Sequence, residues 1–500
     1  MILCRFFCPI VALATILSSS ADALAARKPR VDPGVHRTLR QQATVNLMVT
    51  MHGGTGAALA EADVLASSSA SGSDSTSTSR GARIAHLVDS LEASATSAQR
   101  PLAALLAQEA DSPSSTPLFS SSTRLWITNQ LFIADASVSL LQKLMAQPSI
   151  AEIREELVLT MGDDLEIELL DGPTTANTTL TVNTQAWGIE KIGTAAVWDQ
   201  GFTGQNVTVA TIDSGVRVTH EALRGNFLGD YGWFDPGTKR ATPYDSSGHG
   251  SHVTGSMVGA QGIGVAPGAQ WMACRGCSSA TSCLESELLA CAQFVLCPTD
   301  PAGENADCSK APHVVNNSWG VTEGSADFSA VIAAWRAADI IPVFANGNSG
   351  SAATCSTVVS PADASNVIGV GASSSDDSLF VQSSTGPASD GRIKPDLTAP
   401  GVSVYSAWWT RDNIYAITSG TSMAAPHVAG AVALLLSAKP ELSYDEIWTV
   451  LTNSTARDED QMSATGHATC GNLSTTSFPN NLFGYGRLDI QQAIASLLSA

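Results

Sequence analysis

The sequence predicts an α/β protein in which a domain with a mainly parallel sheet, covered by helices on both faces, follows a smaller α+β domain. Two observations predict this class. Beyond residue 184, short apolar strands alternate with helical patterns, which is the order of a parallel sheet with crossover helices. Between residues 26 and 171 the order is strand, helix, strand, helix, strand, and a Thr-, Asn- and Pro-rich stretch at 172–184 separates the two parts.

The smaller domain is expected to be an α+β sandwich with an antiparallel, ferredoxin-like sheet. It combines alternating apolar residues, a long helical pattern and a low-complexity Ser/Thr stretch at 67–79. Its expected strands are 44–51, 122–133 and 150–158, and its expected helices are 84–108 and 136–145.

The larger domain, 185–500, repeats the strand–helix unit several times. Its expected strands are 206–212, 271–273, 313–315, 341–344 and 367–370, and its expected helices are 249–259, 284–296, 326–338 and 421–438. Sites in such sheets lie beyond the carboxyl ends of the strands, so the chemistry is expected just after each strand.

The N-terminus has the pattern of a secretory signal peptide. Arg5 precedes an apolar run at 6–17, and small residues end at Ala25, which predicts a signal of residues 1–25. The alternative of a membrane anchor is less favoured, because the run is shorter than the roughly 20 apolar residues that span a bilayer. We therefore expect a secreted protein without a membrane segment.

Composition and cysteine usage agree with export. The formal net charge of -20 argues against a nucleic-acid-binding surface. Eight cysteines lie between Cys274 and Cys470, enough for four disulfides, and a zinc site at the C-x-x-C of Cys274 and Cys277 is the less favoured alternative. Glycosylation motifs occur at Asn177, Asn206, Asn316, Asn453 and Asn472, the third of them in a run expected to be buried.

Three residues at predicted element ends are suited to nucleophilic catalysis. Asp213 closes an apolar strand, His249 lies between two glycines at a helix start, and Ser422 lies in a Gly-Thr-Ser turn that opens an apolar helix. Acyl transfer needs a hydroxyl, an imidazole that accepts its proton and a carboxylate that fixes the imidazole. Each residue alone has a structural alternative: Asp213 as a turn residue, His249 as a satisfied polar residue and Ser422 as a helix cap.

Taken together, these segments resemble the subtilisin-like serine proteases, or subtilases. Their three motifs are similar to ATIDSGV around Asp213, SGHGSHVTGSMVG around His249 and SGTSMAAPHVAG around Ser422, in the same chain order. Further runs such as GIGVAPGAQ, VVNNSWG and KPDLTAPG are also similar, and AAWRAADIIPVFANGNSG with FGYGRLD resembles the bacillopeptidase F-like branch. The resemblance covers about 187–488.

The resemblance implies further site residues. It assigns the oxyanion-hole amide to Asn348 of ANGNSG rather than to Asn346, with the Ser422 backbone N–H as the second donor. Ser318, Trp319 and Gly320 correspond to the family's edge that pairs with an extended substrate, although a core role for the Trp319 ring is the alternative.

Two positions depart from the family pattern. Ser251 stands where the family has Thr, which should preserve the helix start. Val359 falls where Gly commonly lines the bottom of the P1 pocket, so its side chain should shorten the pocket and favour small or medium P1 residues. No cofactor is implied as required, and calcium, common in the family, has no assignable site in this sequence.

The resemblance also gives the first domain a role. Residues 26–184 correspond to a propeptide that occupies the active site until it is cut away, with the cut expected within 172–184. The sequence therefore predicts a secreted, monomeric serine endopeptidase made as a zymogen, acting on proteins or peptides. The alternatives are an inactive peptide-binding homologue, an adhesive extracellular protein, and a sedolisin-type acid protease, which would carry Glu in place of His249.

Overall fold

The computed structural model describes residues 28–61, 79–111, 116–161, 167–171, 186–279, 281–322, 324, 328–351, 354–457, 462, 469–474 and 476–499. The predicted signal peptide, nearly all of the Ser/Thr stretch and the predicted linker lie outside these residues. The chain forms two compact units: one comprises residues up to Gly54 together with Ala93–Glu156, and the other comprises Thr55–Glu92 together with Leu157–Ala500.

The smaller unit has a five-stranded sheet with the order β1-β5-β2-β4-β3. All neighbours are antiparallel except β1 and β5. The strands are β1 (Arg30–Val31), β2 (Thr44–Met51), β3 (Ser121–Leu125), β4 (Gln130–Ser137) and β5 (Ile150–Glu155). Helices α2 (Pro33–Gln41) and α5 (Val138–Leu144) and the C-terminal part of α4 (Arg80–Ala110) complete the unit, and Leu47, Leu102 and Ile133 lie in its core.

One expectation for this unit was wrong, and one helix was not predicted. The predicted strand 122–133 is two strands joined by the 3-10 turn η1 (Trp126–Thr128), because Asn129 adopts φ 53° and donates its N–H to the Trp126 carbonyl. Asn accepts this left-handed conformation more readily than most residues, so the chain reverses there. Helix α2 was missed, although Asp32 caps its N-terminus by accepting from the Gly34 N–H at 2.6 Å.

The larger unit contains a seven-stranded sheet in which every neighbouring pair is parallel, as predicted. Its order is β17-β16-β14-β12-β8-β10-β9. The strands are β8 (Thr208–Asp213), β9 (Trp233–Phe234), β10 (Gln270–Arg275), β12 (Val314–Asn317), β14 (Ile341–Ala345), β16 (Ile368–Ser373) and β17 (Leu397–Pro400). Val209, Val314 and Ile368 are fully buried, as expected for strands covered on both faces.

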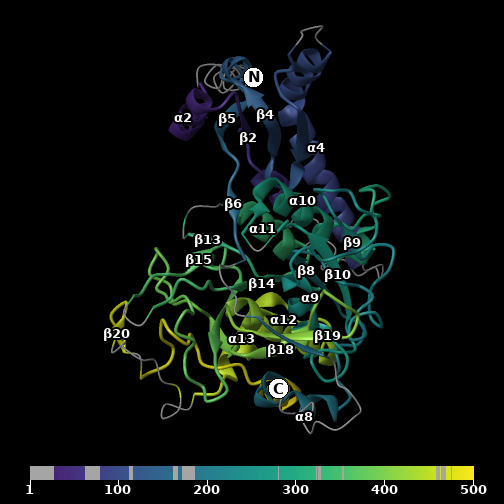
Figure 1. Cartoon of the computed structure of the whole chain (residues 1–500), viewed down its shortest axis with the longest axis vertical. Coiled ribbons are helices and arrows are strands. Elements are labelled where there is room, and N and C mark those ends of the chain that lie inside the picture. Colours follow the sequence, from purple (N-terminus) through teal and green to yellow (C-terminus); the bar gives the residue numbers. More distant parts are fainter. Residues whose placement is uncertain are drawn as a thin grey trace, which may run out of the picture. The chain divides into compact units, whose positions relative to one another are not determined.

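Two helix pairs pack on the sheet. Helices α9 (His249–Val258) and α12 (Thr421–Ala438) contact each other and the strands, and α10 (Glu285–Leu296) and α11 (Ser329–Ala337) form a second pair on the other side of β14 and β8 (Figure 1). Helix α12 is long and apolar enough to cross a membrane, but 89% of it is buried in this unit, as in the core helix of a globular domain. The remaining helices are α7 (Trp187–Lys191), α8 (Thr194–Trp198), η2 (Cys308–Lys310), α13 (Tyr444–Asn453) and α14 (Ile490–Ser499).

Small sheets flank this core. Strand β6 (Val158–Leu159) pairs with β11 (Cys283–Leu284), and β7 (Glu168–Asp171) adds a third strand to β18 (Val404–Ala407) and β19 (Ile414–Thr418). Two further pairs are β13 (Val321–Thr322) with β15 (Val359–Ser360), and β20 (Thr469–Cys470) with β21 (Leu473–Ser474). Strands β6 and β7 thus pack with the larger unit although they precede the predicted linker.

The eight cysteines between Cys274 and Cys470 form four disulfides. The pairs are Cys274–Cys291, Cys277–Cys283, Cys297–Cys308 and Cys355–Cys470. Since both cysteines of the C-x-x-C are oxidised, with different partners, they are not available as zinc ligands.

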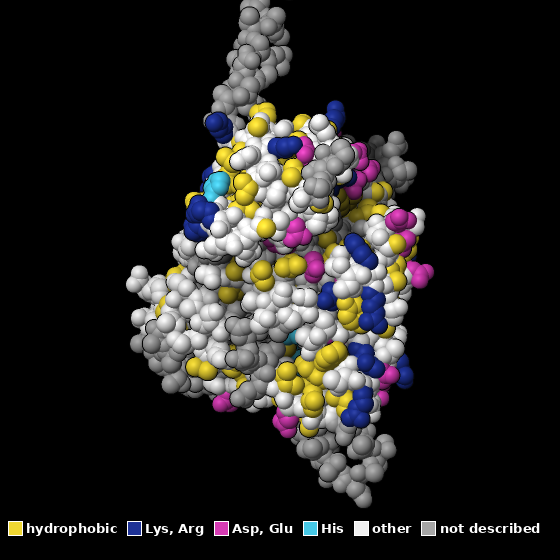
Figure 2. Space-filling view, turned by 45° about the horizontal axis from the view of Figure 1, so that its top comes forward, with side chains coloured by type: hydrophobic (Ala, Val, Ile, Leu, Met, Phe, Trp, Pro, Cys, Tyr) yellow, Lys and Arg dark blue, Asp and Glu magenta, His cyan; other side chains and the backbone are white. Residues whose placement is uncertain are grey.

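Most of the described surface in Figure 2 is uncharged, in line with a charged fraction of 14%. Asn316 is fully buried in β12, as expected.

Candidate active site

The parallel sheet brings four strand ends to one place. Strands β14, β12, β8 and β10 are neighbours in the sheet. Asp213 is the last residue of β8, and Ser318 directly follows β12. Asn348 and Cys277 lie in the turns after β14 and β10. Because the strands run in the same direction, these residues emerge at the same edge of the sheet. The predicted site residues from distant parts of the sequence therefore converge.

Asp213 and His249 are joined by a buried hydrogen bond. The Asp213 carboxylate accepts from His249 Nδ1 at 2.8 and 3.1 Å, and the side chains are 0% and 2% exposed. The Ser214 N–H donates to Asp213 Oδ1 at 2.7 Å. The glycine at 250 permits this approach, because a Cβ there would lie 2.0 Å from the Gly215 carbonyl oxygen. Since a carboxylate only accepts hydrogen bonds, the neutral His249 ring carries its proton on Nδ1 and presents Nε2 as a base.

A second buried carboxylate, Asp245, supports the start of α9. Its oxygens accept from the N–H groups of three residues and from two hydroxyls, at 2.6 to 3.0 Å. These donors are the N–H groups of Ser247, Gly248 and Ser251 and the hydroxyls of Ser214 and Ser251. Ser214 Oγ in turn accepts from the Gly250 N–H at 3.0 Å, so the backbone on both sides of His249 is fixed.

Asp245 was not among the residues predicted from the sequence. Its signal is an acidic residue four positions before His249, in a Ser- and Gly-rich turn that enters a helix, where a carboxylate is favoured. Ser251, the departure from the family's Thr, keeps the hydroxyl function, since it donates to Asp245 and accepts from the Arg217 N–H.

Two carboxylates hold the pKa of His249 above its ordinary value. Burial lowers this pKa, but the charge and hydrogen bond of Asp213 and the charge of Asp245 outweigh burial. Burial raises the pKa of Asp245, although hydrogen bonds from the Ser214 and Ser251 hydroxyls and from the Ser247 and Gly248 N–H groups oppose this. His249 Nε2 is buried and has no hydrogen-bond partner among the described residues.

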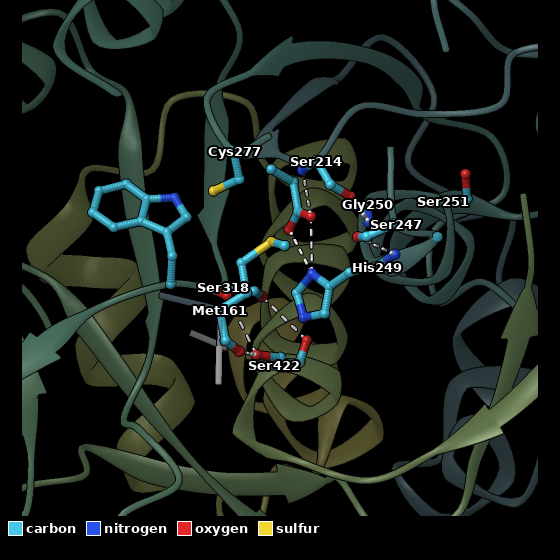
Figure 3. A network of polar contacts seen from close by, with 12 residues as sticks. Met161, Ser214, Ser247, His249, Gly250, Ser251, Cys277, Ser318 and Ser422 are labelled. Carbon is cyan, nitrogen blue, oxygen red and sulfur yellow. Dashed lines mark hydrogen bonds and ion pairs between the residues drawn. The ribbon is translucent and has the colours of Figure 1, made fainter. Parts of the chain in front are cut away.

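Ser422 is the second residue of α12 and is 2% exposed. Its Oγ lies 3.3 Å from the carbonyl oxygens of both Ser318 and Met161, and Figure 3 shows Ser422 next to the His249 ring. The hydroxyl thus points at a backbone carbonyl of the chain itself. The N–H groups and positive dipole end of α12 face the same region, where they favour negative charge.

The amide of Asn348 is oriented by the turn before Ser422. Its Oδ1 accepts from the N–H and the hydroxyl of Thr421, both at 2.9 Å, which directs the amide N–H groups away from Thr421. Asn348 also lines the cavity at Ser422. Asn346, in contrast, is fully buried and donates to the Ser384 carbonyl at 2.6 Å. Of the two asparagines, Asn348 lines the cavity and Asn346 lies in the core.

The edge Ser318–Gly320 is paired with an extended segment. Thr160 and Gly320 exchange backbone hydrogen bonds of 3.0 and 2.8 Å, and β6 pairs with β11 just upstream. The Trp319 side chain is a core aromatic: it is 3% exposed, donates to the Ile212 carbonyl and contacts Phe344. Its backbone, rather than its ring, therefore forms the edge.

A cavity of about 1080 Å³ lies beside Ser422. Val359 lines it and stands between two glycines, since a Cβ at Gly320 or Gly347 would approach a Val359 methyl to 2.5 or 2.6 Å. The structure thus places Val359 on the cavity wall, where its side chain reduces the space.

Other buried histidines have structural contacts. His427 Nδ1 interacts with the Met423 carbonyl at 2.8 Å, and burial lowers the pKa of His427 to about 4, as in a histidine packed within the core. Among the described residues, no three His, Cys, Asp or Glu side chains gather so that they could hold a metal ion. The expectation that no cofactor is required stays a prediction, and calcium, which is common in the family, stays without an assigned site.

Comparison with known proteins decides the family. The model of the subtilase family matches residues 204–486. The chain belongs to the subtilase family. The resemblance predicted from the three motifs is thereby confirmed, and the family is one of serine-type endopeptidases.

Three bacterial proteases show the similarity of this subtilase to known proteins. It is 34% identical to bacillopeptidase F of Bacillus subtilis over 335 residues, which cover 62% of this chain and 22% of the relative. It is 33% identical to subtilisin E of the same species over 314 residues, covering 61% and 70%. Serine protease AprX, also of this species, is 31% identical over 299 residues, covering 52% and 64%. This subtilase thus spans about a fifth of bacillopeptidase F and about two thirds of the other two.

Because the charge of Asp245 raises the pKa of His249, removal of that charge should change the pH at which His249 titrates. The Asp245→Asn variant removes a negative charge that raises the pKa of His249, so the midpoint of the His249 titration should move to lower pH. NMR titration of the imidazole in a Ser422→Ala background, which avoids self-digestion, measures the midpoint. Asp230→Asn, the same change at an exposed position, should leave it unchanged. An unshifted midpoint in Asp245→Asn would contradict this electrostatic role.

Proposed function

We propose that this subtilase is a secreted serine endopeptidase, made as a zymogen, that cleaves peptide bonds through an acyl-enzyme. Asp213 orients His249, His249 acts as base and then as acid, and Ser422 is the nucleophile. The observation that carries the proposal is the contact at Ser422: its hydroxyl meets the Met161 carbonyl of an extended segment, beside a histidine held by a buried carboxylate.

The geometry supports a two-step hydrolysis. Rotation about the Ser422 Cα–Cβ bond turns the hydroxyl toward the free Nε2 of His249, which takes its proton as Oγ attacks the carbonyl carbon. The imidazolium is stabilised by Asp213 and gives the proton to the leaving amine. Water then repeats the sequence on the acyl-enzyme, with His249 again as base, and releases the acid and free Ser422.

Negative charge on the carbonyl oxygen needs donors that are already in place. The amide N–H of Asn348, with Oδ1 fixed by Thr421, and the backbone N–H of Ser422 at the start of α12 supply them. Removal of one such donor from a subtilisin lowers kcat by roughly 10²–10³.

Substrate recognition uses the main chain before the scissile bond. Gly320 and β11 pair with an extended peptide from two sides, so affinity comes from backbone hydrogen bonds and selectivity from pockets for side chains. The cavity narrowed by Val359 takes the P1 side chain, and we propose that it prefers small or medium residues.

The region before the catalytic domain acts as an inhibitor of the same chain. The described residues of two stretches of it, 55–92 and 157–171, belong to the same compact unit as the catalytic residues. The Arg80 guanidinium donates to the carbonyls of Ala311 and Pro312 at 2.9 and 2.6 Å, and residues 157–161 occupy the substrate edge. Secretion is supported by the N-terminal pattern and by the four disulfides.

The catalytic assignment is tested at Ser422. The Ser422→Ala variant should lose peptide hydrolysis and labelling by a fluorophosphonate, because both need the hydroxyl. Ser437→Ala, the same change about four turns further along the predominantly buried helix α12, should keep both activities. Labelling that persists in Ser422→Ala would place the nucleophile elsewhere.

The contact at Met161 supports a first cut upstream of the linker predicted from the sequence. We propose that Ser422 attacks one of the two peptide bonds that follow Met161, since this is where the chain reaches the nucleophile. Mass spectrometry of the first processed form should therefore find an N-terminus at Gly162 or Asp163. A first product that begins within 173–185 would favour the linker instead.

The role of Val359 is tested by a graded series. Val359→Ala and Val359→Gly should progressively deepen the P1 pocket, and the ratio of kcat/KM for P1 Phe over P1 Ala should rise about tenfold in the glycine variant. Steady-state kinetics on peptides that differ only at P1 measure the ratio. A ratio that stays constant across the series would show that Val359 does not limit the pocket.

A further inference from the structure

The loop between β10 and α10 contains a disulfide next to β11, which is one of the two edges that pair with the residues before the scissile bond. Cys277 and Cys283 are both fully buried and are joined across a sequence separation of 6. Cys277 follows the carboxyl end of β10, and Cys283 opens the two-residue strand β11. The bond thus connects the main sheet with one edge of the substrate site.

Its first end is fixed to the catalytic strand. The N–H groups of Gly276 and Cys277 donate to the Asp213 carbonyl at 2.9 and 3.1 Å. The Cys277 carbonyl accepts from Ser246 Oγ at 3.3 Å, in the turn that leads to His249. Figure 3 shows Cys277 close to Ser214 at the catalytic residues. Cys277 therefore has a fixed position relative to the Asp213–His249 pair.

The second end of the disulfide, Cys283, lies in β11, a strand with few pairing contacts of its own. Strand β11 pairs only with β6, through Cys283 with Leu159 and Leu284 with Val158, and this sheet has no third strand among the described residues. Just beyond it, the Glu285 N–H donates to the Leu157 carbonyl at 3.1 Å. An isolated two-residue pair is marginal, so β11 needs another restraint when no peptide is bound.

We propose that the Cys277–Cys283 disulfide is a positioning device that holds β11 opposite Gly320, so that extended substrates find both edges in place. This inference rests on the proposed function and makes the two cysteines positioning residues, since neither reacts with substrate. A general stabilising role explains the bond less well, because a loop of six residues constrains the unfolded chain less than the separation of 115 closed by Cys355–Cys470.

The test compares an extended substrate with a short one. In the Cys277→Ser, Cys283→Ser double variant, KM for a chromogenic peptide with four residues before the scissile bond should rise at least tenfold. The kcat/KM for a single-residue ester with the same P1 residue should change less than twofold, because it does not reach β11. The inhibition constant of a synthetic peptide of residues 157–161 should rise in parallel with the KM of the long substrate.

A matched control removes another short-loop disulfide. The Cys297→Ser, Cys308→Ser double variant lacks a bond of separation 11 and should keep the wild-type ratio between the two substrates. If the Cys277→Ser, Cys283→Ser protein does not fold in usable amounts, a Cys277→Ala, Cys283→Val double variant takes its place. These side chains keep the buried space apolar.

The possible outcomes distinguish the positioning role of the disulfide from the proposed function. An unchanged KM for the long substrate, or an equal loss on both substrates in the variants of Cys277 and Cys283, overturns the positioning role. Wild-type enzyme that hydrolyses neither substrate would instead contradict the proposed function, so the two failures are distinguishable.

Discussion

Parallel pairing of β14, β12, β8 and β10 is the constraint on which the rest of the structure depends. Because these four strands run in one direction, residues separated by more than 130 positions in sequence meet at one sheet edge, and α12 adds Ser422 to them. Hydrogen bonds then fix the orientation of these groups. Asp213 holds the His249 ring, Asp245 holds the start of α9, and the turn at Thr421 holds the Asn348 amide.

Much of the larger unit and its site could be predicted from the sequence. Strand–helix alternation gave the parallel sheet, and helix α12 has the bounds expected from its apolar pattern. The candidate residues Asp213, His249 and Ser422 were recognisable because each stands at an element end, between glycines or in a turn. These local signals are strong because strand ends and helix starts restrict which residues fit.

Other features depend on contacts that leave little local trace. Asp245 acts through five donors gathered by folding, and its sequence context alone reads as a turn. Residues 157–161 read as the end of a strand, yet their pairing partners Cys283 and Gly320 lie more than 120 positions away. The break at Asn129 rests on a single left-handed residue, which an alternating apolar pattern does not show.

Strands β6 and β7 lie on opposite sides of Met161 in sequence and belong to different sheets. If the chain is cut beside Met161, the two new ends are therefore held independently: β7 stays covalently attached to the enzyme, while the upstream fragment remains only through non-covalent contacts. The cut and the onset of activity then become separate events. Under the proposed inhibition by residues 157–161, loss of the released fragment, rather than peptide-bond cleavage, would open the substrate edge.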